Sequence, residues 1–369
     1  MRQVDIEEIH WIAEGAQVLG AGGGGSAYQG GLALRRHMRL GARVTVLDAA
    51  ELADDAQGTV VTGMGAPTVA MERVASTGRW RTLLHHVRGA AGRLDFLAIG
   101  EIGGGNALSP LVGAAESGLP VVDADPMGRA FPELQMNTYS MGGVVPSPLV
   151  LCDGKGVVAS LAGVPDPFTA ERYARALTWA MGGSAGKAMG LVTGADVRSL
   201  GIAGTLTLAE SIGRAMDGAR SQKRPTVDAI LEVVPTGRRL FEGKIVDVVR
   251  RTVAGFARGL IRVVGLGANA GQRLEIEFQN EYLIARRDDG RVLLTVPDLV
   301  VLVEQESGRA LGSEAVRYGL RVDVLGLPAA HEVKTARALA VVGPRAFGYD
   351  VDFHPLPGDL LGRPERMLP

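Results

Sequence analysis

QVLGAGGGGSAYQGG, residues 17–31, holds seven of the chain's 52 glycines, and its interpretation decides the fold of the N-terminal part. Gly20, Gly22 and Gly25 spell G-x-G-x-x-G, the fingerprint of a dinucleotide-binding loop. Asp48 ends the predicted strand RVTVLD at the place where a ribose-binding carboxylate would belong. A dinucleotide fold also needs a strand immediately before the first glycine, so the preceding residues test this interpretation.

Those preceding residues predict a helix instead of a strand. Their apolar side chains recur every three or four positions, at Ile6, Ile9, Ile12, Ala16 and Leu19. After the loop, GGLALRRHMRLG predicts a second helix, which Gly41 ends. Two other interpretations therefore stay open beside the dinucleotide loop. The glycines could only let helices approach closely, or their backbone N–H groups could hold an anion or a substrate carbonyl at a helix N-terminus.

Strands and helices alternate along the first 165 residues, which predicts an α/β domain with a parallel sheet and helices on its faces. Residues 166–369 differ, because one helical segment is followed by short β-branched runs between turn signals. This part predicts a mostly β domain with one or two helices, built as a barrel or a compact sandwich.

Polar or glycine-rich segments follow three of the predicted parallel strands. They cover Gly63–Gly65, Glu101–Asn106 and Asp123–Arg129. Ligands of open α/β sheets collect at the carboxyl ends of the strands. We therefore expect these three segments to meet at one cleft.

Composition and charge narrow the function classes. The net charge is −1 and no long basic run occurs, which argues against nucleic-acid binding. The acidic N-terminus and the lack of an 18-residue apolar run predict a cytoplasmic protein that does not enter a membrane. Cys152 is the single cysteine, so no internal disulfide can form, and its apolar neighbours predict a core position.

Several segments, in the same order along residues 5–350, resemble the S-methyl-thiohydantoin desulfurase family. They are LGAGGGGSAYQGG, DADPMGRAFPELQMNT, IAGTLTLAESIG, FQNEYLIAR, VPDLVVLVEQESG, RYGLRVDVL and VGPRAFGYD. The resemblance implies an N-terminal α/β domain, a β-rich C-terminal domain and a role in hydantoin and thiohydantoin breakdown. It implies a hydrolase that releases methanethiol from a small heterocyclic substrate, as a homo-oligomer with a hydantoinase-like protein as a potential partner. A non-catalytic subunit of such a system and a nucleotide- or NAD-binding enzyme are the alternatives.

Such a hydrolysis needs a general base, a proton donor and hydrogen-bond donors facing the ring carbonyls. Asp125 is the first candidate for the base or for a metal ligand, and Asp123 shares its side if the strand continues. Arg129 and Glu133 lie four apart and would share a helical face. An Asp–Arg pair that only shapes the loop is an equal alternative. Glu101 is a further candidate, because an acid at a buried strand end is unusual.

Candidate substrate-binding residues come from the loop and from the second half. Gly22, Gly23, Gly24, Gly25 and Ser26 would present backbone donors, and Asn106 would either bind substrate or cap the next helix. Asn280 and Glu281 interrupt an apolar strand and would point to opposite faces, so only one of them would face a cleft.

No cofactor follows firmly from the sequence. The six histidines are scattered and form no zinc-binding pattern. Asp123 and Asp125 with a distant acid could hold a divalent metal such as magnesium.

Overall fold

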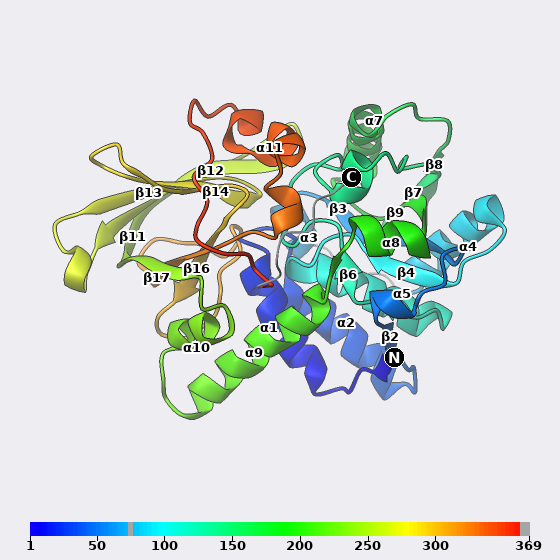
Figure 1. The fold of residues 1–369 in the computed structure, drawn as a ribbon, viewed down its shortest axis with the longest axis horizontal. Coiled ribbons are helices and arrows are strands. Elements are labelled where there is room, and N and C mark those ends of the chain that lie inside the picture. Colours follow the sequence, from blue (N-terminus) through cyan, green and yellow to red (C-terminus); the bar gives the residue numbers. More distant parts are fainter. Residues whose placement is uncertain (73–76, 362–369) are drawn as a thin grey trace.

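An eight-stranded mixed sheet forms the frame of the N-terminal part in the computed structural model, which describes residues 1–72 and 77–361 (Figure 1). Its strands, in spatial order, are β1 (Arg2–Gln3), β2 (Thr45–Leu47), β5 (Val121–Val122), β4 (Phe96–Ile99), β3 (Gln57–Gly65), β9 (Ser184–Thr193), β7 (Leu149–Cys152) and β8 (Val158–Leu161).

The α/β class is confirmed, but only part of the sheet is parallel. Strands β2, β5, β4 and β3 pair in parallel, whereas β1, β9, β7 and β8 pair antiparallel with their neighbours. Strand β9 lies beyond residue 165 in the sequence and still pairs with β3. The alternation of strands and helices therefore predicted the parallel core but not the antiparallel half.

Both faces of this sheet are buried, as the continuous apolar run of β4 indicates. Leu97 and Ile99 belong to the same hydrophobic core as Ile9 of α1 (Glu8–Leu19). Phe96 and Ala98 point the other way, into the core that includes helix α7 (Pro167–Ala180). Further helices of this part are α2 (Ala27–Arg39), α3 (Pro67–Met71), α4 (Arg79–Ala91), α5 (Ser109–Ser117), α6 (Thr138–Met141) and α8 (Gly194–Leu200).

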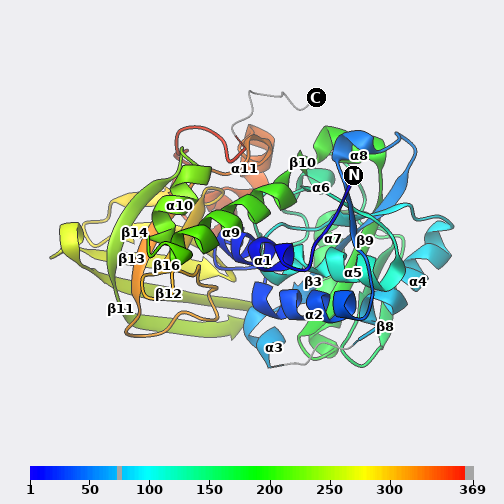
Figure 2. The ribbon, with the colours of Figure 1, turned by 90° about the horizontal axis from the view of Figure 1, so that it is seen from below.

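Helix α1 packs along α9 (Thr205–Ser221), and Figure 2 shows the two side by side. Glycines make this close approach possible. A Cβ on Gly15 would overlap the carbonyl of Ala209, and a Cβ on Gly213 would overlap the carbonyl of Trp11. The first residues of the chain are thereby packed against a helix some 200 positions later.

The C-terminal part is built on one antiparallel sheet of seven strands, whose two edges approach each other as in a half-barrel. Of the two expected forms, this curled single sheet agrees with the barrel and not with the two-layered sandwich. In spatial order the strands are β15 (Val292–Thr295), β14 (Glu281–Arg287), β13 (Arg273–Gln279), β12 (Phe256–Gly265), β11 (Arg238–Val253), β17 (Arg321–Leu327) and β16 (Leu299–Glu304).

More helices occur after residue 165 than the one or two expected. Within residues 166–361 these are α7, α8 and α9 together with α10 (Thr226–Val233) and α11 (Ala336–Val342). Two short strands, β6 (Ala124–Asp125) and β10 (Ile202–Ala203), pair with each other outside the large sheets. The 3-10 turns are η1 (Ala49–Glu51), η2 (Gly104–Ala107), η3 (Gly267–Asn269), η4 (His331–Val333) and η5 (Pro344–Phe347).

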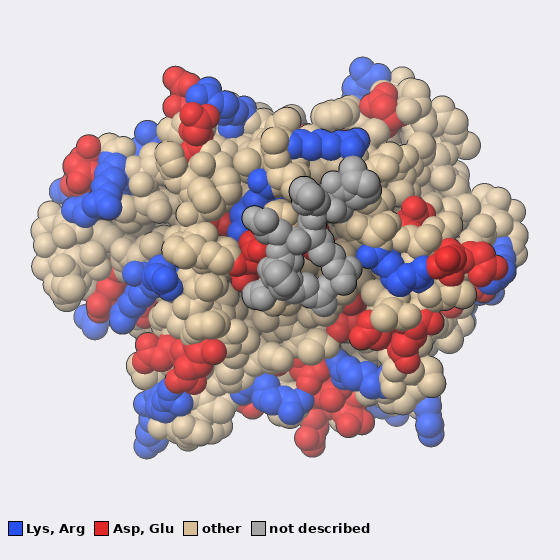
Figure 3. Space-filling model, viewed as in Figure 1, with Lys and Arg blue, Asp and Glu red and all other residues tan. Residues whose placement is uncertain are grey.

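The surface shows no field of one sign on the face drawn in Figure 3, where basic and acidic side chains are interspersed. This agrees with the near-neutral net charge. None of the helices in the described ranges has the length and apolar character needed to cross a bilayer.

Candidate functional site

The glycine loop joins α1 to α2 and is anchored through its carbonyl groups. Gly24 O accepts a hydrogen bond from Asn106 N, and Gly25 O accepts one from Gly105 N, each at 3.0 Å. Ala21 O accepts one from Tyr282 N of the C-terminal part at 2.7 Å. The loop is therefore fixed between the second glycine loop, Gly103–Gly105, and the sheet of the C-terminal part.

Because the carbonyls face the protein framework, some N–H groups remain free for a ligand. The N–H groups of Gly24, Gly25 and Ser26 donate no hydrogen bond to any residue within the described ranges. Ser26 caps α2 by accepting a hydrogen bond from Gln29 N. These donors therefore lie at the positive end of a 13-residue helix, as the cradle interpretation expects.

Two glycines of the loop are required by close approach. A Cβ on Gly23 would overlap Glu281 Oε1, and a Cβ on Gly24, whose φ is +75°, would overlap the carbonyl of Gly103. Gly22 lies against the C-terminal part as well, because a Cβ added to it would be 2.7 Å from the Tyr282 ring. The closest contacts of Gly22 and Gly23 are thus to the C-terminal part, whereas Gly24 and Gly25 reach a pocket.

Replacing Gly23 by Ala is expected to lower the free energy of unfolding by about 1–3 kcal/mol, because the added methyl group displaces the Glu281 side chain. Chemical denaturation measures the change. Gly89→Ala is the control: Gly89 is exposed inside α4 with no atom near its missing Cβ, and this change should stabilise by about 0.5–1 kcal/mol. Equal stability of Gly23→Ala and wild type would contradict the packing described here.

Glu101 follows β4 and lies on the wall of a pocket. It is 7% exposed. Its Oε1 accepts a hydrogen bond from Asn106 Nδ2, and its Oε2 accepts one from Phe131 N at 3.3 Å. Burial raises the pKa of Glu101 to about 7, against the opposing effect of the Asn106 hydrogen bond and the Lys187 charge. This carboxyl can therefore give and take a proton near neutral pH.

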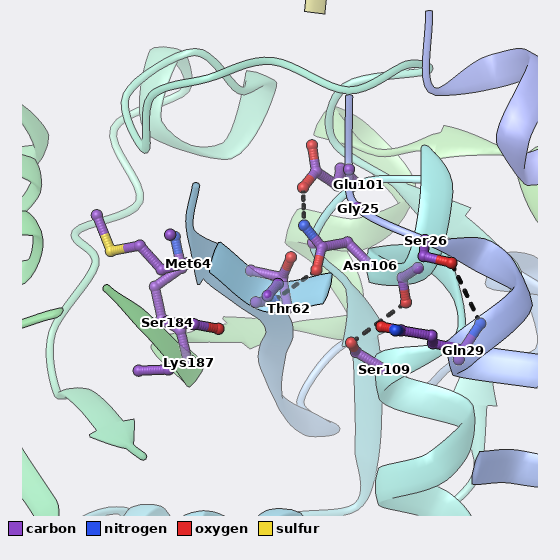
Figure 4. A pocket seen from close by; sticks show the side chains of 18 of the residues that line it. Gly25, Ser26, Gln29, Thr62, Met64, Glu101, Asn106, Ser109, Ser184 and Lys187 are labelled. Carbon is purple, nitrogen blue, oxygen red and sulfur yellow. Dashed lines mark hydrogen bonds between the residues drawn. The ribbon is translucent and has the colours of Figure 1, made fainter. Parts of the chain in front are cut away.

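Asn106 orients Glu101 rather than capping a helix. Its Oδ1 accepts a hydrogen bond from Gly63 N at 2.9 Å. Its Nδ2 donates to Glu101, as Figure 4 shows. Helix α5 begins after Leu108 without a side-chain cap. The capping alternative is thus wrong, because both polar atoms of the amide are used between two strand ends.

Asn280 and Glu281 both line the pocket, so the expectation that only one would do so is wrong. FQNEYLIARR is not one strand: Asn280 has a φ of +60° and reverses the chain between β13 and β14. Asn280 Oδ1 accepts a hydrogen bond from Ala257 N, which holds this hairpin against β12. The expectation assumed one continuous strand, in which neighbouring side chains point to opposite faces. Because the chain reverses at Asn280, this alternation does not hold there.

The sequence reasoning missed Lys187, a buried lysine of β9. It lies opposite Thr62 of β3 in the antiparallel register, and both line the pocket. Burial lowers the pKa of Lys187 to about 8, opposed by the charge of Glu171. A lysine among small apolar residues in GKAMG was the available signal, but it indicates a pocket only once β9 is known to pair with β3.

The pocket has a cavity volume of about 610 Å³ and opens at the carboxyl ends of β3 and β4. Figure 4 shows Thr62, Asn106, Ser184 and Lys187 around it. Two of the three expected strand-end segments meet there, and the third contributes Met127 alone. The candidate residues on its wall are Gly24, Gly25, Ser26, Glu101, Asn106, Glu133, Asn280 and Glu281.

Asp123 and Asp125 do not act on a common side and are not among the described residues of the pocket wall. Asp123 accepts hydrogen bonds from Leu206 N and Thr207 at the start of α9. Asp125 is fully buried and accepts hydrogen bonds from Ile102 N, Met127 N and Gly128 N. These contacts favour a structural role for both, although burial raises the pKa of Asp125 to about 7.

Arg129 and Glu133 do not share a helical face, because the segment between them is not helical. Arg129 is fully buried and donates to four carbonyl groups, those of Ala130, Tyr282, Pro297 and Asp298. It therefore ties the two parts of the chain together away from the pocket wall. Glu133 does reach the wall, where it accepts hydrogen bonds from Gln135 and Gln279.

The G-x-G-x-x-G segment does not follow a strand, as a dinucleotide-binding loop requires. Helix α1, not a strand, leads into Gly20. Asp48, the candidate ribose ligand, caps η1 by accepting a hydrogen bond from Ala50 N at 2.9 Å. The G-x-G-x-x-G pattern here is a helix–loop–helix connection.

A metal site was one option for the acidic segment. No cluster of three or more His, Cys, Asp or Glu side chains suited to a metal ion occurs within residues 1–72 and 77–361. The divalent metal stays a prediction.

Comparisons with known proteins agree with this architecture. The N-terminal domain of a family described as S-Me-THD-like matches residues 7–162, and its C-terminal domain matches residues 165–356. The chain is also similar to a protein from Chromobacterium violaceum whose X-ray crystal structure was determined by the Northeast Structural Genomics Consortium. The two share 25% sequence identity with a TM-score of 0.81, over 96% of this chain and 100% of that chain. No curated protein matches the chain.

Proposed function

The chain belongs to the S-Me-THD-like (S-methyl-thiohydantoin desulfurase-like) family, and on this premise we propose that it hydrolyses the carbon–sulfur bond of an S-methyl-thiohydantoin. The pocket at the carboxyl ends of β3 and β4 is the proposed place of reaction. A single observation carries the proposal: Glu101 stands on the pocket wall, fixed by Asn106, with a pKa near neutrality.

In the proposed reaction, water adds to the ring carbon that bears sulfur, and the products are a hydantoin and methanethiol. A new carbon–oxygen bond forms and the carbon–sulfur bond breaks. Glu101 takes the proton of the attacking water and later gives it to the leaving thiolate, so that this carboxylate is restored after each turnover. A carboxyl with a pKa of about 7 suits both steps, because neither form is strongly favoured.

The loop donors support the same reaction. Negative charge that develops on a ring carbonyl oxygen needs preorganised hydrogen-bond donors. Gly24, Gly25 and Ser26 line the pocket at the N-terminus of α2, and their N–H groups donate to no residue in the described part of the chain. Carbonyl anchoring on the opposite side of the loop keeps these donors in place before a substrate arrives.

The direct test is turnover in water enriched in oxygen-18. We expect purified protein to release one methanethiol per hydantoin formed, and the hydantoin to carry the heavy oxygen at the carbon that lost sulfur. Mass spectrometry follows both products. Release of methanethiol without the label, or no release from any S-methyl-thiohydantoin, would contradict a hydrolytic reaction.

A further inference from the structure

Glu281 is another carboxyl on the pocket wall, and it belongs to the C-terminal part of the chain. It begins β14 directly after the reversal at Asn280 and is 2% exposed. Its Oε2 is buried and has no hydrogen-bond partner among residues 1–72 and 77–361. The missing Cβ of Gly23 leaves the space that Oε1 fills. This carboxyl is thus seated against the glycine loop with one oxygen unsatisfied.

The charged groups around Glu281 are Glu101, Arg129 and Arg175. Neither arginine donates a hydrogen bond to it. Arg129 uses its donors on carbonyl groups, and Arg175 uses its donors on Glu171 and on the carbonyl of Pro132. Burial and the like charge of Glu101 raise the pKa of Glu281 well above its usual range. Both effects favour the protonated form of the Glu281 carboxyl.

We propose that Glu281 is the partner of Glu101 in proton transfer, the group that donates a proton to the ring nitrogen as water adds to the adjacent carbon. This inference rests on the function proposed above. When the carbon–sulfur bond breaks, the Glu281 carboxylate takes the proton from the hydroxyl group of the tetrahedral intermediate, and the ring carbonyl forms.

With this role for Glu281, both protons of the attacking water are accounted for in the complete reaction. Glu101 passes one water proton to methanethiol, while Glu281 gives one proton to the ring nitrogen and recovers the other water proton. Both carboxyls return to their starting states, and no further reactant is needed. Two carboxyls with different proton affinities in one pocket are suited to such complementary roles.

Glu281→Gln tests the assignment, because glutamine keeps the size and a hydrogen-bond donor but cannot transfer a proton. We expect KM to stay within about threefold and kcat to fall about 100- to 1,000-fold. The falling limb that Glu281 gives to the pH profile of kcat should disappear, whereas Glu101→Gln should remove the rising limb. Glu306→Gln, a control at an exposed position, should keep wild-type values.

Several outcomes separate the two proposals. A wild-type protein that releases no methanethiol overturns the proposed function and this inference with it. An active wild type with a Glu281→Gln variant of normal kcat, or one that keeps the falling limb, overturns only the role of Glu281. If the variant fails to fold, NMR of wild-type protein labelled at the glutamate carboxyl carbons gives the answer. One glutamate is expected to lose its proton at a higher pH than Glu101, and loss of both protons over the same pH range would overturn the assignment.

Discussion

Glu101→Gln is expected to lower kcat for methanethiol release about 100- to 10,000-fold while leaving the protein folded. The amide fills the same space and still accepts the hydrogen bond from Asn106, but it cannot take a proton from water. The amide nitrogen takes the place of Oε2, so the Phe131 N–H loses its acceptor and we expect a loss of stability of about 1–3 kcal/mol, which a stable protein tolerates. Steady-state kinetics with a thiol reagent measure the loss.

The matched control for this variant is Glu306→Gln, which makes the same chemical change on an exposed loop. Circular dichroism and a thermal melt confirm that both proteins are folded. A folded Glu101→Gln protein with turnover within about threefold of the control would rule out Glu101 as the base.

Asp125→Ala is expected to give the largest loss of stability, about 3–5 kcal/mol. The alanine leaves the N–H groups of Ile102, Met127 and Gly128 without an acceptor in a fully buried site. Equilibrium unfolding in urea measures the change. Asp5→Ala, at an exposed position, should change stability by no more than about 0.5 kcal/mol.

Asp125→Asn separates the structural role of Asp125 from the role of base that the sequence first suggested. Asparagine keeps one acceptor oxygen, so the folded fraction of this variant should turn over substrate within about tenfold of wild type. A loss as large as that of Glu101→Gln, in a protein shown to be folded, would return Asp125 to the role of base.

Local patterns predicted much of the frame around the site. The apolar spacing before Gly20 predicted α1 and argued against the dinucleotide fold, and the structure confirms this helix. Glu101 was a candidate because it is an acid at the end of a buried strand. Since ligands collect at the carboxyl ends of parallel strands, this strand end was expected beside Gly63–Gly65, as the pocket shows. These predictions succeeded because each depends on residues close together in the sequence.

The remaining features depend on contacts between distant segments. Lys187 joins the pocket only because β9 pairs with β3, some 120 residues earlier. Glu281 joins it because Asn280 adopts a positive φ, which a strand-like run of residues does not reveal. The structural role of Asp123 and Asp125 also depends on distant segments. Their hydrogen-bond donors come from α9 and from the turns after β4 and β6.

The pH dependence of kcat/KM for methanethiol release is the measurement that bears most directly on Glu101 as the base. Only the ionised carboxylate can accept a proton, and burial raises its pKa, so activity should rise with pH through about 7. The residual activity of Glu101→Gln should lack this rise. A wild-type profile that is flat between about pH 5.5 and 8.5, or a rise that persists unchanged in the variant, would contradict the assignment.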